Sequence, residues 1–155
     1  MKPNTLFIMV ALMLSLFSSA CSTPTTQAPA VTVSSEVSQS SGVEDQTSLI
    51  DALRTNGAEV ELGDPVEQPF LSVTGQIIKV DEQDVQVFEY ESAELMEADA
   101  TQVAPDGSSI GTTMVTWVEP PHFFKSGRIL VLYVGKDAGV IDLLTGALGE
   151  QFAGQ

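Results

Sequence analysis

Hydrophobic and polar residues alternate in short blocks over most of the chain after residue 45, and the spacing within each block predicts a helix or a strand. The first block predicts an amphipathic helix that begins at the capping-box sequence 48–51. Its apolar face carries Leu49, Ile50 and Leu53. Asn56-Gly57 then offers a left-handed stop, so this helix is expected to be short.

The clearest strand pattern follows at 76–80 and 85–90, which are rich in β-branched and aromatic residues. They flank the polar stretch 81–84, and together they predict a β-hairpin. Two weaker extended pieces precede this hairpin, at 59–62 and 70–73, and each adjoins turn or proline residues.

A second helix is predicted from Ala93 to about Val103, with Ser92 as its cap. Its narrow apolar stripe consists of Met96, Ala100 and Val103. The other face carries the acids, which are expected to lie in water: Glu94, Glu97 and Asp99.

The last third of the chain predicts two more strands and a helix. The segment 112–118 has a strand pattern that Pro120-Pro121 interrupts. Residues 129–134 are apolar at every position, which predicts a central strand covered on both faces. Asp137 caps a final helix that Gly149 ends.

Strands in hairpins with helices between them indicate an α+β fold. We expect a single globular domain over 46–155, with an antiparallel or mixed sheet and helices packed on it as a two-layer sandwich.

The N-terminal block differs from all of these. An apolar, uncharged run at 6–17 follows Lys2 and closes on the small residues 18–20, directly before Cys21. Cys21 is the only cysteine in the chain. The run is shorter than the roughly 20 residues of a membrane-spanning helix, and the pattern predicts a secretory signal that ends in a lipidation site.

At this cysteine the sequence resembles the lipobox of bacterial lipoproteins, with Ala20 and Ser19 as the small residues before Cys21. The resemblance implies that 1–20 is a cleaved signal peptide and that Cys21 receives diacylglycerol on its sulfur, with a further acyl chain such as palmitate on its new amino group. The protein would then be exported and anchored in the cell membrane or outer membrane, on the periplasmic or cell-surface side. A plain cleaved signal and an uncleaved anchor are the alternatives.

Residues 21–45 are dominated by Ser, Thr, Ala, Pro and Val. Such a composition has too little large apolar surface to fold, so we expect a disordered tether after the lipidated cysteine. A tether of this length spans about 25 Å on average, enough to hold a domain away from a bilayer.

The chain is strongly acidic, with 6 Lys and Arg against 21 Asp and Glu. Because Lys2 leaves with the signal, five cations remain against 21 acids and the mature net charge is −16. This charge argues against nucleic acid and anionic lipid head groups as partners. Solubility is the simplest role of the acidity, and a basic partner is the alternative.

Candidate chemistry is sparse. His122 is the only histidine, and without a free cysteine or a nucleophile-elbow motif it forms no recognisable catalytic or zinc constellation. Asp81, Glu82 and Asp84 lie close together but lack the calcium-loop pattern. We therefore expect no metal, no cofactor and no catalytic residue.

One stretch is chemically unusual. Two prolines follow Trp117 and stiffen a predicted loop that gathers aromatic and cationic residues, a combination that recognition sites use. The candidate contacts for a peptide, a glycan or a small ligand are Trp117, His122, Phe123, Phe124, Lys125 and Arg128. The alternative is that Trp117 and a phenylalanine fill the end of the core while His122 and Lys125 face water.

These observations favour a non-catalytic binding or accessory domain tethered to the cell envelope through Cys21, with an envelope protein, peptide or glycan as partner. The alternative is a cell-envelope enzyme or enzyme inhibitor that uses the loop with Trp117, His122 and Phe124. A third hypothesis is a homo-oligomer that forms through an exposed sheet face at strand 129–134.

Overall fold

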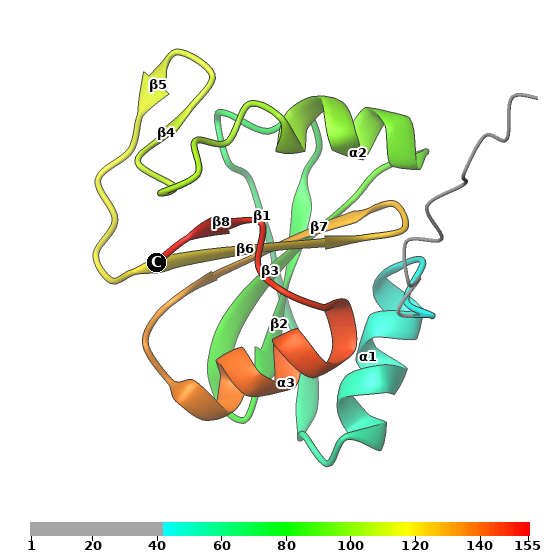
Figure 1. Cartoon of the computed structure of the whole chain (residues 1–155). Helices are drawn as coiled ribbons and strands as arrows, with labels where there is room; N and C mark the ends of the chain where they lie inside the picture. The colour runs from blue at the N-terminus through cyan, green and yellow to red at the C-terminus, as the bar shows by residue number, and fades with distance from the viewer. Residues whose placement is uncertain (1–41) are drawn as a thin grey trace, which may run out of the picture. The chain divides into compact units, whose positions relative to one another are not determined.

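The computed structural model describes residues 42–155, which form one α+β domain (Figure 1). The helices are α1 (Gln46–Thr55), α2 (Ala93–Ala100) and α3 (Ala138–Leu148). The strands are β1 (Val60–Val66), β2 (Gly75–Val80), β3 (Gln83–Glu89), β4 (Ser109–Ile110), β5 (Thr113–Met114), β6 (Pro121–Ser126), β7 (Ile129–Val134) and β8 (Ala153–Gly154). Within this part of the chain no helix is long and apolar enough to cross a membrane.

Six strands form one antiparallel sheet in the order β1-β2-β3-β7-β6-β8. Strand β7 lies between β3 and β6, and its residues from Ile129 to Tyr133 are buried. The prediction of a central strand with both faces covered is therefore confirmed. Strands β4 and β5 form a separate two-stranded ribbon.

Helices lie on both faces of the sheet. One hydrophobic cluster joins α1 and α3 to the sheet, and a second joins α2, the ribbon and the loop before β2 to the opposite face. Figure 1 shows α1 and α3 on one side of the sheet and α2 on the other. The predicted α+β fold, an antiparallel sheet with helices packed on it, is confirmed.

This arrangement removes the basis of the homo-oligomer hypothesis. Leu130 and Leu132 are fully buried on the α2 side of β7, and Val131 is fully buried on the α1 and α3 side. Since the domain itself covers both faces of this strand, 129–134 offers no exposed sheet face to a second copy.

The predicted hairpin at 76–80 and 85–90 is confirmed as β2 and β3. Asp81 and Glu82 form its two-residue turn, and both have positive φ angles, 47° and 69°. Positive φ at both central positions is the geometry of a type I′ turn. The acidic stretch is thus a tight turn.

The first helix begins earlier than predicted. Asp45 is its N-cap, and the Ser48 hydroxyl accepts the backbone N–H of Asp45 at 3.0 Å in a capping box. The predicted box lies three residues too late, because Ser48 fits the cap pattern equally well. Val43, which is 1% exposed, also packs in the core.

Two expectations about extended segments were wrong. Strand β1 continues past the turn-like residues at 63–65 because a bulge between Leu62 and Pro65 absorbs them. Proline is tolerated there because β1 is an edge strand. Residues 70–73 form turns and bends instead of a strand.

The prediction for 112–121 was also wrong. Only Thr113–Met114 is a strand in the predicted segment 112–118. Pro121 begins β6 instead of interrupting a ladder, because the first residue of a strand can lack an N–H.

The chain enters the domain along the turn between β6 and β7. The backbone N–H of Arg128 donates to the carbonyl of Glu44 at 3.0 Å, and the Ser126 hydroxyl donates to the carbonyl of Val43 at 2.7 Å. Gly127, at φ 52°, lies directly against Glu44. This turn is therefore the fixed point from which the N-terminal part of the chain leaves the domain.

Candidate functional site

Trp117 is held in place by two aromatic neighbours. Its ring makes edge-to-face contacts with Phe70 at 6.1 Å and with Phe123 at 5.9 Å. Its indole N–H donates to the carbonyl of Gly107 at 2.7 Å. Because such contacts fix both ends of the ring, Trp117 has one orientation and is half-buried.

His122 is buried in strand β6 and does not lie in a loop. It is 6% exposed, and its ring stacks on Tyr133 at 5.9 Å. Its Nδ1 lies 2.7 Å from Gln151 Oε1, and its Nε2 lies 3.1 Å from the carbonyl oxygen of Gly135. Both ring nitrogens are therefore used to join β6 to the segment after β7 and to the segment after α3.

Phe123 and Phe124 alternate along β6, as the two-residue period of a strand requires. Phe123 is buried on the α2 side and Phe124 on the α1 and α3 side. Both are fully buried, so neither is available to a ligand at the surface.

The two predicted cations are engaged in ion pairs. Lys125 binds Glu97 of α2 at 2.6 Å and lies 5.0 Å from the centre of the Phe152 ring. Arg128 lies at the β6–β7 turn, 2.7 Å from Glu89 and 3.5 Å from Asp45. Both cations therefore take part in contacts between elements of the domain.

The structure therefore brings together only part of the predicted constellation. Trp117 and Phe123 touch, whereas His122 and Phe124 lie on the other face of the sheet and Arg128 lies at the other end of β6. The expected loop with Trp117, His122 and Phe124 does not exist as one surface.

A groove of about 350 Å³ lies beside Trp117. Its apolar lining includes Val115, Trp117, Pro120 and Pro121, and its acidic lining consists of Asp106 and Glu119. The β4–β5 ribbon adjoins it through Ser108 and Val115 and carries the exposed side chain of Met114. The predicted unusual stretch thus supplies four of the nine residues that line the groove.

Asp106 was not predicted as part of this site. Its carboxylate accepts the Ser108 backbone N–H at 3.0 Å and the Ser108 hydroxyl at 2.7 Å. These hydrogen bonds hold the pKa of Asp106 below its ordinary value. Asp106 is therefore charged at neutral pH, and the hydrogen bond from Trp117 to Gly107 brings the two segments together.

A buried carboxylate was also missed. Asp99 was expected to face water, yet it is 8% exposed. It accepts hydrogen bonds from the Ser72 backbone N–H and hydroxyl, each at 2.8 Å, and from the Tyr90 hydroxyl at 2.9 Å. Its position three residues after Met96, on the buried stripe of α2, was the available signal.

Among residues 42–155 no group of three or more His, Cys, Asp or Glu side chains is arranged to hold a metal ion. Asp81, Glu82 and Asp84 are accounted for by the β2–β3 turn and by the ion pair of Asp84 with Lys79 at 3.2 Å. Cys21, the predicted lipidation site, lies outside the described residues.

Comparisons of this chain with protein-family models, with curated proteins and with solved structures found no match.

Proposed function

We propose that this protein is a lipoprotein of the bacterial cell envelope, anchored through Cys21, whose folded domain serves as a binding or accessory module rather than as an enzyme. The anchor follows from the sequence pattern at 6–21. The binding role is inferred from how the domain uses its reactive side chains and from the groove beside Trp117.

The observation that carries the binding role is the environment of His122. A general base must reach both a nucleophile and the substrate. His122 instead contacts a side-chain amide, a backbone carbonyl and a tyrosine ring, and it is almost completely buried. Its contacts are those of a structural residue that holds Gln151 and the end of β7.

The Tyr90–Asp99 pair supports the same interpretation. Burial, followed by the hydrogen bond to Asp99 and the charge of that carboxylate, raises the pKa of Tyr90 far above its ordinary value. A phenol in this state stays protonated and donates to Asp99. The pair therefore fastens the loop at Ser72 to α2 and is not exposed to a substrate.

The point of chain entry suits a tethered binding module. The N-terminal part of the chain enters the domain at the end of β6, beside Arg128, whereas the groove lies at the start of β6, beside Pro121. A strand of six residues separates two such points by about 17 Å. In Figure 1 the two ends of β6 lie on opposite sides of the domain.

Lipidation is tested by expressing the full chain with its own leader in a bacterial host and separating the extract between a detergent phase and water. The wild-type chain is expected in the detergent phase, because two or more acyl chains bury enough CH₂ groups for stable anchoring. Cys21→Ala is expected in the aqueous phase.

Ser19→Ala is the matched control for that experiment. It keeps a small residue before the cleavage site and is expected to partition like the wild type. Recovery of the wild-type chain in water with a free Cys21 thiol would contradict the anchor, whatever the domain binds.

A further inference from the structure

The groove beside Trp117 has both apolar and acidic residues in its lining. Its walls come from the loop before β4, the segment after β5 and the start of β6. Aromatic contacts with Phe70 and Phe123 fix the ring of Trp117. The pyrrolidine rings of Pro120 and Pro121 fix the backbone φ angles of these two residues. The groove is therefore preformed.

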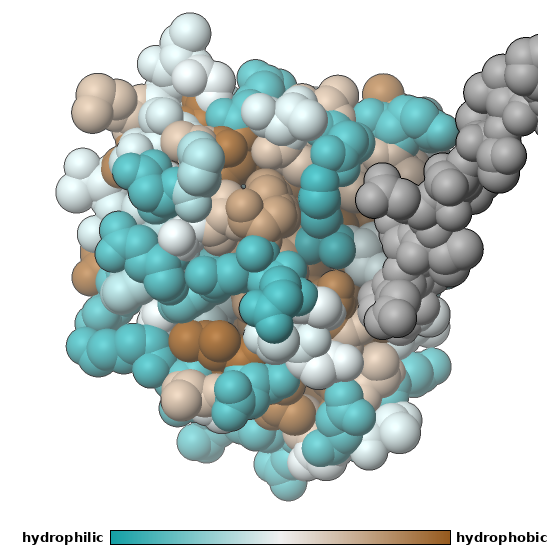
Figure 2. Space-filling view, viewed as in Figure 1, coloured by the Kyte–Doolittle hydropathy of each residue, from teal (hydrophilic) through white to brown (hydrophobic). Residues whose placement is uncertain are grey.

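An uncharged, exposed surface continues from this groove. Residues 107–118 contain no charged side chain, although the chain carries 21 acids. Within this segment Met114 is 87% exposed and Val118 is 92% exposed. Figure 2 shows mostly pale residues of intermediate hydropathy at the margin of the molecule where Figure 1 places the β4–β5 ribbon. Met114 and Val118 therefore add exposed apolar area to this uncharged segment.

The charges at the groove have one predominant sign. Asp106 and Glu119 line it, and none of the described residues that line it is a cation. Glu119 also binds the exposed Lys136 at 3.2 Å. Asp106 has no cation as a partner among the described residues and makes its hydrogen bonds to Ser108.

The segment after β5 also has free backbone groups. Among the described residues, no backbone hydrogen bond uses the N–H or C=O groups of Thr116, Trp117 or Val118. A partner that is itself a polypeptide can pair with such groups through its own main chain.

We propose that this surface binds an extended polypeptide segment in which arginine or lysine alternates with apolar residues. A cationic side chain enters the groove between Asp106 and Glu119, and apolar side chains of the partner pack against Met114 and Val118. Charge complementarity selects the cationic class, and the free backbone of 116–118 selects a polypeptide over a small molecule. The proposal rests on the proposed binding role of the domain and names the chemistry of the partner.

Trp117 makes the test direct, because it is the only tryptophan in the chain and lies in the groove. The full-length protein in detergent micelles is titrated with the acetylated and amidated pentapeptide VRVRV, and the emission of Trp117 and the heat of binding are recorded together. We expect saturation with a dissociation constant below about 1 mM. The acidic peptide VEVEV is expected to leave both signals unchanged.

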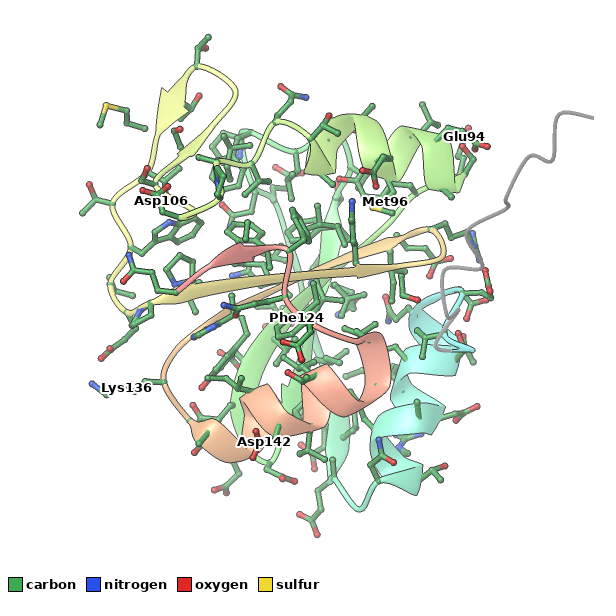
Figure 3. All side chains as sticks on the ribbon, viewed as in Figure 1. Glu94, Met96, Asp106, Phe124, Lys136 and Asp142 are labelled. Carbon is green, nitrogen blue, oxygen red and sulfur yellow. The ribbon has the colours of Figure 1, made fainter. Side chains whose placement is uncertain are left out.

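Asp106→Asn and Glu119→Gln remove a charge while they keep the size of each side chain. Each is expected to weaken VRVRV binding by about threefold to fivefold, the usual effect of one exposed charge pair. Asp142→Asn is the matched control, since Asp142 is exposed on α3, away from Asp106 (Figure 3). This variant is expected to bind like the wild type.

Four outcomes would overturn the proposal: no emission change and no heat up to about 1 mM VRVRV, equal binding of VEVEV, an equal loss in Asp142→Asn, or a concentration-dependent emission change of the chain alone. The third indicates non-specific attraction to an acidic protein, and the fourth indicates a second copy as the occupant. None of them bears on the acylation of Cys21, so this test and the partition test fail independently.

Discussion

At the scale of single residues, the Asp99 carboxylate joins separate segments on one face of the domain. A buried carboxylate is costly unless hydrogen bonds replace its water. Ser72 and Tyr90 supply those bonds, from a loop and from the end of β3. Asp99 thus joins three segments that are separate in the sequence.

Tyr90→Phe tests this contact. It removes one hydrogen bond to a charged acceptor, so we expect the free energy of unfolding at pH 7 to fall by about 2 kcal/mol. Because the folded protein holds the pKa of Tyr90 above the unfolded value of about 10, wild-type stability is complete below pH 10 and declines as pH rises beyond it. Urea unfolding between pH 7 and pH 11 should show that Tyr90→Phe loses much of this decline.

Tyr133→Phe is the matched control, since Tyr133 is the other tyrosine of the chain and its hydroxyl accepts the Asp137 backbone N–H at 3.2 Å. The Tyr133→Phe variant is expected to keep the loss of stability above pH 10 that Tyr90 causes. An unchanged pH dependence in Tyr90→Phe would show that the phenol is not held by Asp99.

Residue-scale contacts were the least predictable part of the molecule. The periodicity of α2 places Asp99 near the buried stripe, but its partner Ser72 is 27 positions away and no local pattern marks it. In the same way, Trp117 was predicted as a candidate contact, whereas Asp106 lies beside it because the neighbouring Gly107 accepts the hydrogen bond of the indole.

At the scale of elements, helices and strands with a strong apolar periodicity were predicted correctly from the sequence. Strands that contain a proline or a bulge were not. The β2–β3 hairpin, β7 and the capped helix α3 follow from local patterns of apolar residues. Strand β6 was missed because Pro121 usually marks a break. Only the first part of β1 was predicted, because a bulge carries the strand on through Gly63-Asp64-Pro65. A proline or a bulge is interpretable only when the neighbouring strand is known.

Gly127→Ala tests the attachment of the N-terminal segment to the β6–β7 turn. A Cβ at this position would overlap the backbone of Glu44, and φ is 52°, where non-glycine residues are strained. We expect a loss of about 3 kcal/mol in the free energy of unfolding. Amide exchange should also show loss of protection at Arg128, whose N–H binds the Glu44 carbonyl.

Gly57→Ala separates the two causes. Gly57 also has a positive φ, 97°, but nothing lies within 4 Å of an added Cβ. This variant should lose only the strain part, about 1 kcal/mol, and should keep the protection of Arg128. Equal losses in the two variants would show that contact with Glu44 does not matter.

At the scale of the whole molecule, the excess of acids is the dominant electrostatic feature. Lys79, Lys125, Arg128 and Lys136 each bind a carboxylate, and Arg54 donates to the Val60 carbonyl at 2.9 Å. The cations of the described domain are thus all engaged, while most of its acids have no cationic partner. Exposed ion pairs contribute little each, so net repulsion should decide how stability responds to salt.

This balance gives the last prediction. Raising NaCl from about 0.01 M to about 0.15 M shortens the screening length from about 30 Å to about 8 Å and should stabilise the fold by about 1 kcal/mol, seen as a higher melting temperature. Glu59, Glu61 and Glu82 line one hollow together with Lys79. The double variant Glu61→Gln, Glu82→Gln should therefore be more stable than the wild type at low salt. Most of this difference in stability should disappear at high salt, where the repulsion is screened. A melting temperature that falls with salt would mean that the ion pairs outweigh the repulsion, because salt screens attraction and repulsion alike and the stronger of the two sets the sign.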